Sequence, residues 1–324
     1  MKVKISELKL LMLNSLKYLK LSSKQNECIV NHFLNAELSG KTTHGVGKFC
    51  WEKQFFKERK GNPFIEIDKK TVLLVDANKE IGPLAAQYVI NLLIKRVKKY
   101  NIALIGMKNS QRYGSLDTWA SKLANNGLIG IIMNTSEPLV PHPDATLGVL
   151  GTNPMGIGIP TNKYPIIVDM ATSEEPMGLT WQMMRENKKL PDNIFYNDDG
   201  KYTTDPKLAT SVKVFGGYKG FNISLLIQIL STSFLGLPNI VKDKYDIGYV
   251  FIAINPSVFI SMDEFTKNTT KITRTIKSSE KNIVNKKIFI PGEHAEEIRK
   301  NALKNGYMTI PEITWQNLTK DRNE

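Results

Sequence analysis

The 324-residue sequence predicts an α/β protein in which helices pack on a β-sheet; one observation supports this class and a second excludes one fold within it. Over residues 71–106 the apolar pattern has a period of about two, then about 3.6, then about two again, which predicts a strand, a helix over about 82–100 and a second strand. The glycine fingerprint of a Rossmann fold is incomplete, because Thr161 occupies its third glycine position and the segment does not open a helix. A Rossmann fold is therefore not supported.

Composition fits a globular protein without a membrane anchor. No apolar run approaches the roughly 18 residues that a membrane helix needs. Glu7 and Lys9 interrupt the apolar stretch that a signal peptide would require. The two cysteines, Cys28 and Cys50, make neither a disulfide framework nor a zinc motif, so we expect a cytoplasmic protein without a metal site.

The net charge of +13 raises nucleic acid as a partner. The 44 Lys and Arg residues are, however, spread along the chain among acidic residues. The densest basic segments, 96–99 and 274–287, lack the interleaved aromatic residues that stack on bases. We interpret the charge as a solvated lysine-rich surface and regard nucleic acid as an unlikely partner.

The first 50 residues predict two helices. Apolar residues at helical spacing predict the first over 6–20. The second should begin near Ser22, which forms a capping-box pattern with Gln25 three residues later, and should end at Gly40.

A loop over residues 39–49 follows and offers a candidate for proton transfer. Its Gly40-Lys41-Thr42 imitates a phosphate-binding P-loop, but the earlier glycine of that motif is missing, so we reject it. Thr43, His44 and Lys48 supply a hydroxyl, an imidazole and a cation among glycines. An imidazole titrates near neutral pH and suits acid/base catalysis. A surface histidine without a role is the alternative.

Two further segments present polar groups after predicted strands. Residues 109–114 form a polar turn that opens a helix through about Asn125, and Arg112 in this turn is either an anion contact or a solvated cation. A strand over 127–133 ends in a cluster of hydrogen-bonding side chains that includes Ser136.

The stretch from Gly151 to Ser173 reads as two turns and two strands, of which Ile166-Ile167-Val168 is the second. Asp169 follows that buried strand directly. A carboxylate there either contacts a ligand or caps the next helix, and these residues alone leave both interpretations open.

The C-terminal half predicts a helix over about 221–235, a strand over 248–254, a short strand over 288–290, a helix over 295–305 and a short helix after Pro311. Residues 262–287 are polar and basic and should be helical or mobile. Before the first of these helices, glycines on both sides of Lys219 let its ammonium approach a phosphate or carboxylate; an exposed lysine is the alternative.

Taken together, the motifs resemble those of the type-2 malate/L-lactate dehydrogenase family, which includes ureidoglycolate and L-sulfolactate dehydrogenases, over nearly the whole chain. The segments that carry the resemblance are Thr43-His44-Gly45 with Lys48, Asn109-Ser110 with Tyr113-Gly114, Gly151-Thr-Asn-Pro154, Asp169-Met-Ala-Thr-Ser173, Thr204-Asp-Pro206, Gly216-Gly-Tyr-Lys-Gly220 and Pro291-Gly292-Glu293.

The resemblance implies a non-Rossmann α/β fold with a mainly antiparallel mixed sheet wrapped by helices and with helical segments at both ends of the chain. It implies an N-terminal segment over 1–70 that carries the His44 loop, a cofactor-binding domain over 71–260, and a C-terminal segment over 261–324 that packs back on the first. It also implies a homodimer that interconverts 2-oxo and 2-hydroxy acids with NAD or NADP.

The resemblance further implies roles for individual residues. His44 is the expected acid/base, Thr43 orients it, and Lys48 and Arg112 are the expected substrate contacts. Hydride transfer to a carbonyl develops alkoxide charge, which a protonated imidazole neutralises while a cation holds the substrate carboxylate. The expected cofactor contacts are Ser136, Asp169, Met170, Ala171 and Lys219, with Pro291, Gly292 and Glu293 nearby.

Several positions depart from the family pattern, among them Thr43, which replaces the usual serine, and residues 142–145, which replace a glycine-rich turn. Arg112 stands where many members have a histidine, Lys48 where they have an arginine, and Gln228 where a glutamate is common. Lysine lacks the planar two-pronged grip of arginine, so carboxylate binding should be weaker or differently oriented. These changes predict either an altered substrate or a catalytically impaired relative that binds cofactor or another ligand.

Overall fold

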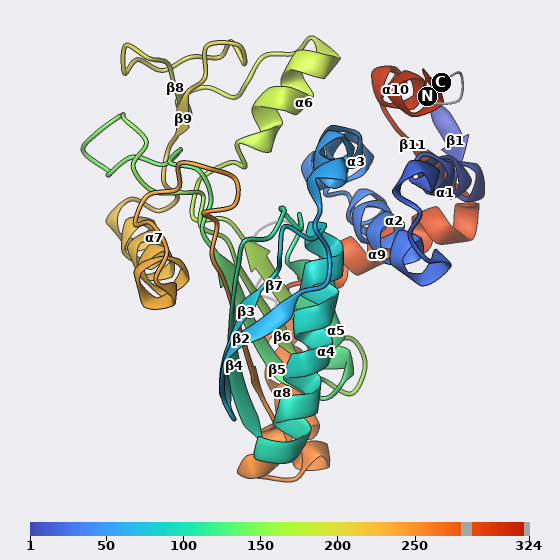
Figure 1. Ribbon diagram of the computed structural model, residues 1–324, viewed down its shortest axis with the longest axis vertical. Helices are drawn as coiled ribbons and strands as arrows, with labels where there is room; N and C mark the ends of the chain where they lie inside the picture. The colour runs from blue at the N-terminus through green and yellow to red at the C-terminus, as the bar shows by residue number, and fades with distance from the viewer. Residues whose placement is uncertain (280–286, 321–324) are drawn as a thin grey trace.

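The computed structural model describes residues 1–279 and 287–320, and its centre is a seven-stranded sheet (Figure 1). All neighbouring strands are antiparallel except the parallel pair β3 and β4. The predicted α/β class and the mainly antiparallel mixed sheet are thus confirmed. In spatial order the strands are β2 (Phe64–Lys69), β3 (Val72–Asp76), β4 (Ile102–Lys108), β10 (Tyr249–Ile254), β5 (Ile129–Asn134), β6 (Met155–Ile159) and β7 (Ile166–Met170).

The strand directions place several polar segments at one edge of the sheet. Because β10 is antiparallel to both β4 and β5, these two strands run the same way. Strand β7 shares their direction, since β6 is antiparallel to both β5 and β7. The segments that follow β4, β5 and β7 therefore emerge at the same edge, which brings Arg112, Ser136 and Asp169 toward one region.

One face of the sheet is covered by α4 (Gly82–Tyr100) and α5 (Asp117–Asn125). Helix α4 buries Ala86, Val89, Leu93 and Val97, which recur at helical spacing, and burying each larger apolar side chain contributes about 1.5–3 kcal/mol. Gly158 lets α5 approach β6 closely, since a Cβ at this position would come within 2.2 Å of a backbone carbonyl oxygen of the helix.

The opposite face is covered by α7 (Tyr218–Ser231), whose Ile227 packs with Met133 and Val250 of the sheet. The inner side of this helix also carries Ser224 and Gln228. Its outer side exposes leucine and isoleucine, so apolar residues surround the helix.

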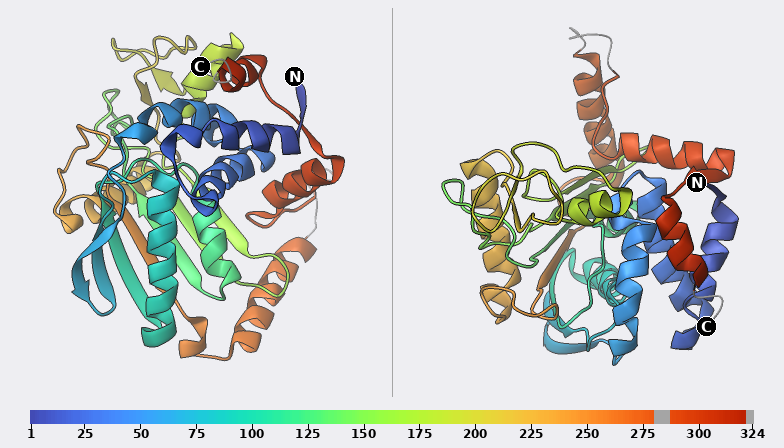
Figure 2. Two further views of the ribbon diagram at one scale, coloured as in Figure 1. Left: turned by 45° about the vertical axis from the view of Figure 1, so that its right-hand side comes forward. Right: turned by 90° about the horizontal axis from the view of Figure 1, so that it is seen from above.

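The first residues of the chain lie beside a strand near its C-terminal end (Figures 1 and 2). Strand β1 (Lys2–Lys4) pairs with β11 (Tyr307–Thr309), and the N-terminal amine donates to the Ile310 carbonyl at 2.7 Å. A second apolar core joins the N-terminal and C-terminal segments. The division into segments 1–70, 71–260 and 261–324 stays a prediction. The helices around this core are α1 (Ile5–Asn14), α2 (Ser23–Leu38), α3 (Val46–Glu52), α9 (Glu293–Asn305) and α10 (Glu312–Lys320).

Several local predictions are confirmed. The Ser22 capping box is present, with the backbone N–H of Gln25 donating to the serine hydroxyl at 3.3 Å and the Gln25 side chain accepting from the Ser22 N–H at 3.0 Å. Helix α4 spans the predicted residues. Residues 262–278 of the segment 262–287 are helical, as α8 (Met262–Ser278), whereas 280–286 lie outside the described residues.

Other local predictions were wrong. The helix expected over 6–20 ends at Asn14, and the helix expected to open at the 109–114 turn begins only at Asp117. Residues 288–290 form no strand, because the Ile290 N–H donates to the side chain of Glu293 instead of to a neighbouring strand.

The loop expected over 39–49 is largely helical. It contains the 3₁₀ turn η2 (Thr42–His44) and the start of α3. Burial of Val46 and Phe49 in the terminal core outweighs the low helix propensity of the glycines beside them. None of the described helices has the length and apolar character needed to cross a membrane.

Candidate active site

His44 ends the η2 turn, between α2 and α3. Its Nδ1 lies 3.0 Å from the hydroxyl oxygen of Thr43, which orients the ring, and its Nε2 makes no hydrogen bond within the described residues. The Glu37 carboxylate of α2 accepts from the Val46 N–H at 2.7 Å and so fixes the turn against α2. Gly45 is required there, since a Cβ would come within 1.9 Å of a Glu37 oxygen.

The electrostatic surroundings of His44 keep the imidazole neutral at neutral pH. Burial lowers its pKa, and the cations Lys48 and Lys41 lower it further. Asp169 and Asp117 act in the opposite direction but do not compensate, so the pKa falls to about 4. The free protein therefore presents His44 as a proton acceptor.

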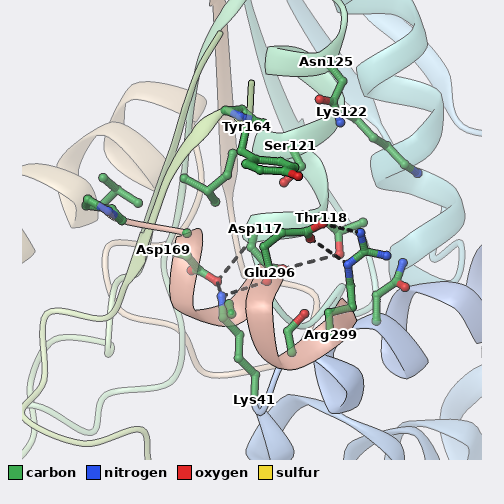
Figure 3. A pocket seen from close by; sticks show the side chains of 18 of the residues that line it. Lys41, Asp117, Thr118, Ser121, Lys122, Asn125, Tyr164, Asp169, Glu296 and Arg299 are labelled. Carbon is green, nitrogen blue, oxygen red and sulfur yellow. Dashed lines mark hydrogen bonds and ion pairs between the residues drawn. The ribbon is translucent and has the colours of Figure 1, made fainter. Parts of the chain in front are cut away.

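Asp169 belongs to a partly buried ion cluster at the carboxyl end of β7. Its Oδ2 accepts from the Lys41 ammonium, from the Ser115 hydroxyl at 2.9 Å and from the backbone N–H of Asp117 at 3.3 Å. Lys41 also pairs with Asp117 Oδ2 at 2.9 Å, so its ammonium lies between the two carboxylates (Figure 3). Asp169 thus accepts at the start of α5, not at the helix that follows it in sequence.

A cavity of about 720 Å³ opens beside this cluster, between α2, α5, β7 and α9 (Figure 3). Asp169, Pro291 and Gly292, which the sequence places far apart, all line it. The Ile167 N–H donates to the Pro291 carbonyl at 3.0 Å and holds that turn against β7. Glu293 is not among the lining residues; its carboxylate binds Lys277 at 2.6 Å.

The cavity has the size and the mixed lining of a small-molecule site. Its volume lies within the range of about 300–1,000 Å³ that is typical of ligand sites. The wall combines apolar Pro165, Ile167 and the Tyr164 ring with the carboxylate of Asp169, whose Oδ1 has no partner among the described residues.

Of the other predicted cofactor residues, Ser136, Met170 and Ala171 lie near Asp169, whereas Lys219 lies apart on α7. Ser136 lies at the same sheet edge as Asp169, and its hydroxyl accepts from the Thr152 N–H at 2.9 Å. The Thr152 carbonyl accepts from the Thr172 N–H at 2.8 Å, which links Ser136 to the segment holding Met170 and Ala171. Lys219 is exposed in the first turn of α7, and no hydrogen bond or ion pair within the described residues joins it to the others.

The two predicted substrate cations meet at the ring of Trp51. The Lys48 ammonium lies 4.3 Å and the Arg112 guanidinium carbon 5.3 Å from the ring centre. Lys48 pairs with Glu52 at 2.9 Å, and Arg112 pairs with Glu137. Each cation is therefore held by an acidic residue, with which a substrate anion would compete.

Sequence reasoning missed four residues of this region. Lys41 lies in the rejected P-loop imitation, and Ser115 and Asp117 follow the 109–114 turn, in the segment predicted as a helix. Glu52 could have been found from its spacing of four residues from Lys48, which places the two side chains on one helix face. No local pattern indicates that Lys41 reaches Asp169.

Gln228 in α7 organises a buried polar network behind Ser136. Its Oε1 accepts from the Thr135 hydroxyl at 2.9 Å and from the Asn153 amide at 3.0 Å, whereas its Nε2 donates to the Asn239 carbonyl at 2.8 Å. An ionised glutamate has no proton for that last bond, which explains glutamine at this position.

Replacing Gln228 by glutamate (Q228E) is expected to lower the free energy of unfolding by about 1–3 kcal/mol at pH 8, because a buried carbonyl loses its donor. The introduced carboxyl has a folded pKa raised by burial, so the loss disappears below its unfolded pKa of about 4.3 and grows as pH rises. Urea unfolding at pH 5 and pH 8 measures this. The exposed Gln316→Glu serves as control; equal stability of Q228E and wild type at pH 8 would refute the network.

Comparisons with known proteins agree over the length of the chain. A family model described as malate/L-lactate dehydrogenase matches residues 3–319. The malate/(S)-sulfolactate dehydrogenase of Methanothermus fervidus is 30% identical over 310 residues, which cover 91% of this chain and 90% of that protein.

Solved structures give the same result. The sulfolactate dehydrogenase from Methanocaldococcus jannaschii matches with a TM-score of 0.87 and 26% identity, covering 100% of this chain and 97% of that one. The malate dehydrogenase from Entamoeba histolytica matches with a TM-score of 0.90 and 25% identity, with the same coverage of 100% and 97%.

Proposed function

The chain belongs to the malate/L-lactate dehydrogenase family, and on this premise we propose that it interconverts a 2-oxo acid and the corresponding 2-hydroxy acid with NAD or NADP, using His44 as the acid/base. The observation that carries this proposal is the position of His44. Its ring is oriented by Thr43, and its pKa responds to Lys41 and Asp169, which line the large cavity.

His44 moves the proton of the reaction. Its neutral imidazole accepts the hydroxyl proton of a 2-hydroxy acid at Nε2, the nitrogen that is not engaged by Thr43. In the reverse direction the protonated ring returns the proton to the carbonyl oxygen. The nicotinamide cofactor supplies hydride acceptance and donation when bound.

The cofactor is assigned to the cavity beside Asp169. Asp169, Pro291 and Gly292 line that cavity, and Ser136, Met170 and Ala171 lie along the same sheet edge as Asp169. Lys219 and Glu293 are retained as cofactor contacts from the family pattern alone.

Lys48 and Arg112 are assigned to the substrate. Malate and sulfolactate, named for the relatives, each carry two acidic groups, and two cations at one aromatic ring suit such a dianion. Binding would transfer the cations from Glu52 and Glu137 to the substrate. We therefore assign a dianionic 2-oxo acid to this site.

We further assign a cytoplasmic homodimer. Free Cys28 and Cys50 accord with a reducing compartment. The outer side of α7 exposes Leu225, Leu226 and Ile229 by 41%, 58% and 47%, an apolar face of the kind that a second copy covers.

Leu226→Glu (L226E) is accordingly expected to convert the dimer into a monomer, because it places a charge in a dry interface. Light scattering after size-exclusion chromatography measures the mass. Leu10→Glu, at an equally exposed leucine of α1, is the matched control. A dimer that persists in L226E would exclude this face as the interface.

The activity itself is tested by following the absorbance of NADH and NADPH with a panel of monoanionic and dianionic 2-oxo acids. Turnover with at least one dianion, and a lower kcat/KM for monoanions, is expected. Absence of turnover with every acid, combined with tight NADH binding in calorimetry, would instead support the catalytically impaired relative. Turnover gained in Arg112→His would then identify Arg112 as the cause.

A further inference from the structure

Lys41 joins three separate elements at the edge of the cavity. It precedes η2 by one residue, and its ammonium contacts Asp117 at the start of α5 and Asp169 at the end of β7. All three side chains line the cavity, and the side chain of Lys41 is 27% exposed. A cation held by two carboxylates beside a ligand cavity restrains their positions more strongly than a surface pair does.

The contacts of Asp169 are unevenly divided between its two oxygens. Within the described residues, Oδ2 accepts from Lys41, Ser115 and the Asp117 N–H, whereas Oδ1 accepts from nothing. Oδ1 is therefore the oxygen that remains for an N–H or O–H donor of a ligand in the cavity.

We propose that Lys41 is a positioning residue of this site, which holds Asp117 and Asp169 together so that Asp169 keeps Oδ1 for a donor of the bound cofactor, and which balances the negative charge facing His44. This inference rests on the proposed function for the identity of the ligand. The ion cluster itself does not depend on it.

Charged and titratable groups face His44 from five elements. They are Lys41 before η2, Lys48 on α3, Asp117 on α5, Asp169 on β7 and the buried His32 on α2. Burial lowers the pKa of His44, and so do the charges of Lys48 and Lys41. The carboxylates of Asp169 and Asp117 raise it. Removing the charge of Lys41 leaves the two carboxylates unbalanced, so the pKa of His44 must rise.

The first experiment is an NMR titration of the His44 imidazole in the cofactor-free protein. Lys41→Met (K41M) is expected to raise the pKa of His44 above that of wild type, and Lys41→Arg (K41R), which keeps the charge, to leave it near wild type. Lys163→Met removes a lysine from the wall of the same cavity that does not act on His44, and should leave the pKa of His44 at the wild-type value. An unchanged pKa in K41M would overturn the proposal.

The second experiment measures NADH affinity by the fluorescence of the reduced nicotinamide. K41M is expected to bind NADH about tenfold more weakly, the effect of one lost oriented hydrogen bond, and K41R to recover most of the affinity. Unchanged affinity in K41M would refute the positioning of Asp169.

The two readouts separate this proposal from the proposed function. Wild type that binds no nicotinamide dinucleotide would contradict the function, whereas the titration still decides whether Lys41 sets the charge at His44. If circular dichroism shows that K41M does not fold, Lys41→Gln takes its place, because glutamine keeps a donor for the carboxylates without the charge. The same rise in the pKa of His44 is expected, and its absence overturns the proposal.

Discussion

Replacing His44 by asparagine (H44N) is expected to lower kcat by about 10²–10⁴-fold, the usual contribution of a positioned general acid or base. Asparagine retains hydrogen-bonding groups of similar size but cannot exchange a proton near neutral pH. NADH affinity should change little, because no cavity-lining contact is removed.

Single-turnover kinetics with saturating NADH measures the effect of H44N on the chemical step. His142→Asn is the matched control, because His142 has a 51% exposed side chain in a loop and has no place in the site. H44N with the turnover of wild type would exclude His44 as the acid/base.

The pKa of His44 also determines the pH dependence of the two directions. Oxidation needs the neutral ring, so kcat/KM for the hydroxy acid should be level above the pKa of about 4 in the free protein and fall below it. Reduction needs the protonated ring, so kcat/KM for the oxo acid should fall by about tenfold per pH unit above that pKa. In K41M both profiles should shift to higher pH, because the pKa of His44 is expected to rise.

Replacing Lys48 by methionine (K48M) should have the second largest effect, raising KM for the 2-oxo acid by about 10–100-fold with a smaller change in kcat. The loss of one charge-assisted contact of about 1.5–3 kcal/mol to a substrate carboxylate accounts for this magnitude. Because Lys48 and Arg112 are assigned to the two acidic groups of a dianion, and a monoanion can still pair with Arg112, dianionic substrates should be affected more than monoanionic ones.

Steady-state kinetics on both kinds of substrate checks K48M. Lys57→Met removes another lysine that lies over an aromatic ring, that of Tyr18, and is the matched control. Lys48→Arg should lower KM below wild type, since a guanidinium binds a carboxylate through two parallel bonds. A KM unchanged in K48M would show that Lys48 does not contact the substrate.

Much of the fold was predictable because its elements carry strong local signals. Helix α4 repeats apolar residues at helical spacing along its whole length, and the Ser22 capping box marks the start of α2. Strand β2 carries a weaker signal, since its apolar and charged residues alternate only over Ile65–Asp68 and the strand is largely exposed at the edge of the sheet. Helix α3 was not predicted because Gly45 and Gly47 lower the helix propensity of its first turn. It forms because Val46 and Phe49 pack into a core built from residues far away in the sequence.

The candidate site was predictable in part. His44, Lys48 and Asp169 follow recognisable turns and strands, and strand direction explains why Arg112, Ser136 and Asp169 share an edge. The contacts of Lys41 were not predictable, because they join segments of the chain more than 70 residues apart through side chains alone.

Transfer of deuterium from NADH labelled at both C4 positions to a dianionic 2-oxo acid tests the central claim most directly. The account predicts a 2-hydroxy acid that carries one deuterium at C2, detected by mass spectrometry, with H44N forming it at least 100-fold more slowly. A hydroxy acid without the label, or no product from any acid of the panel with NADH or NADPH, would contradict the assignment of this protein as a 2-hydroxy-acid dehydrogenase.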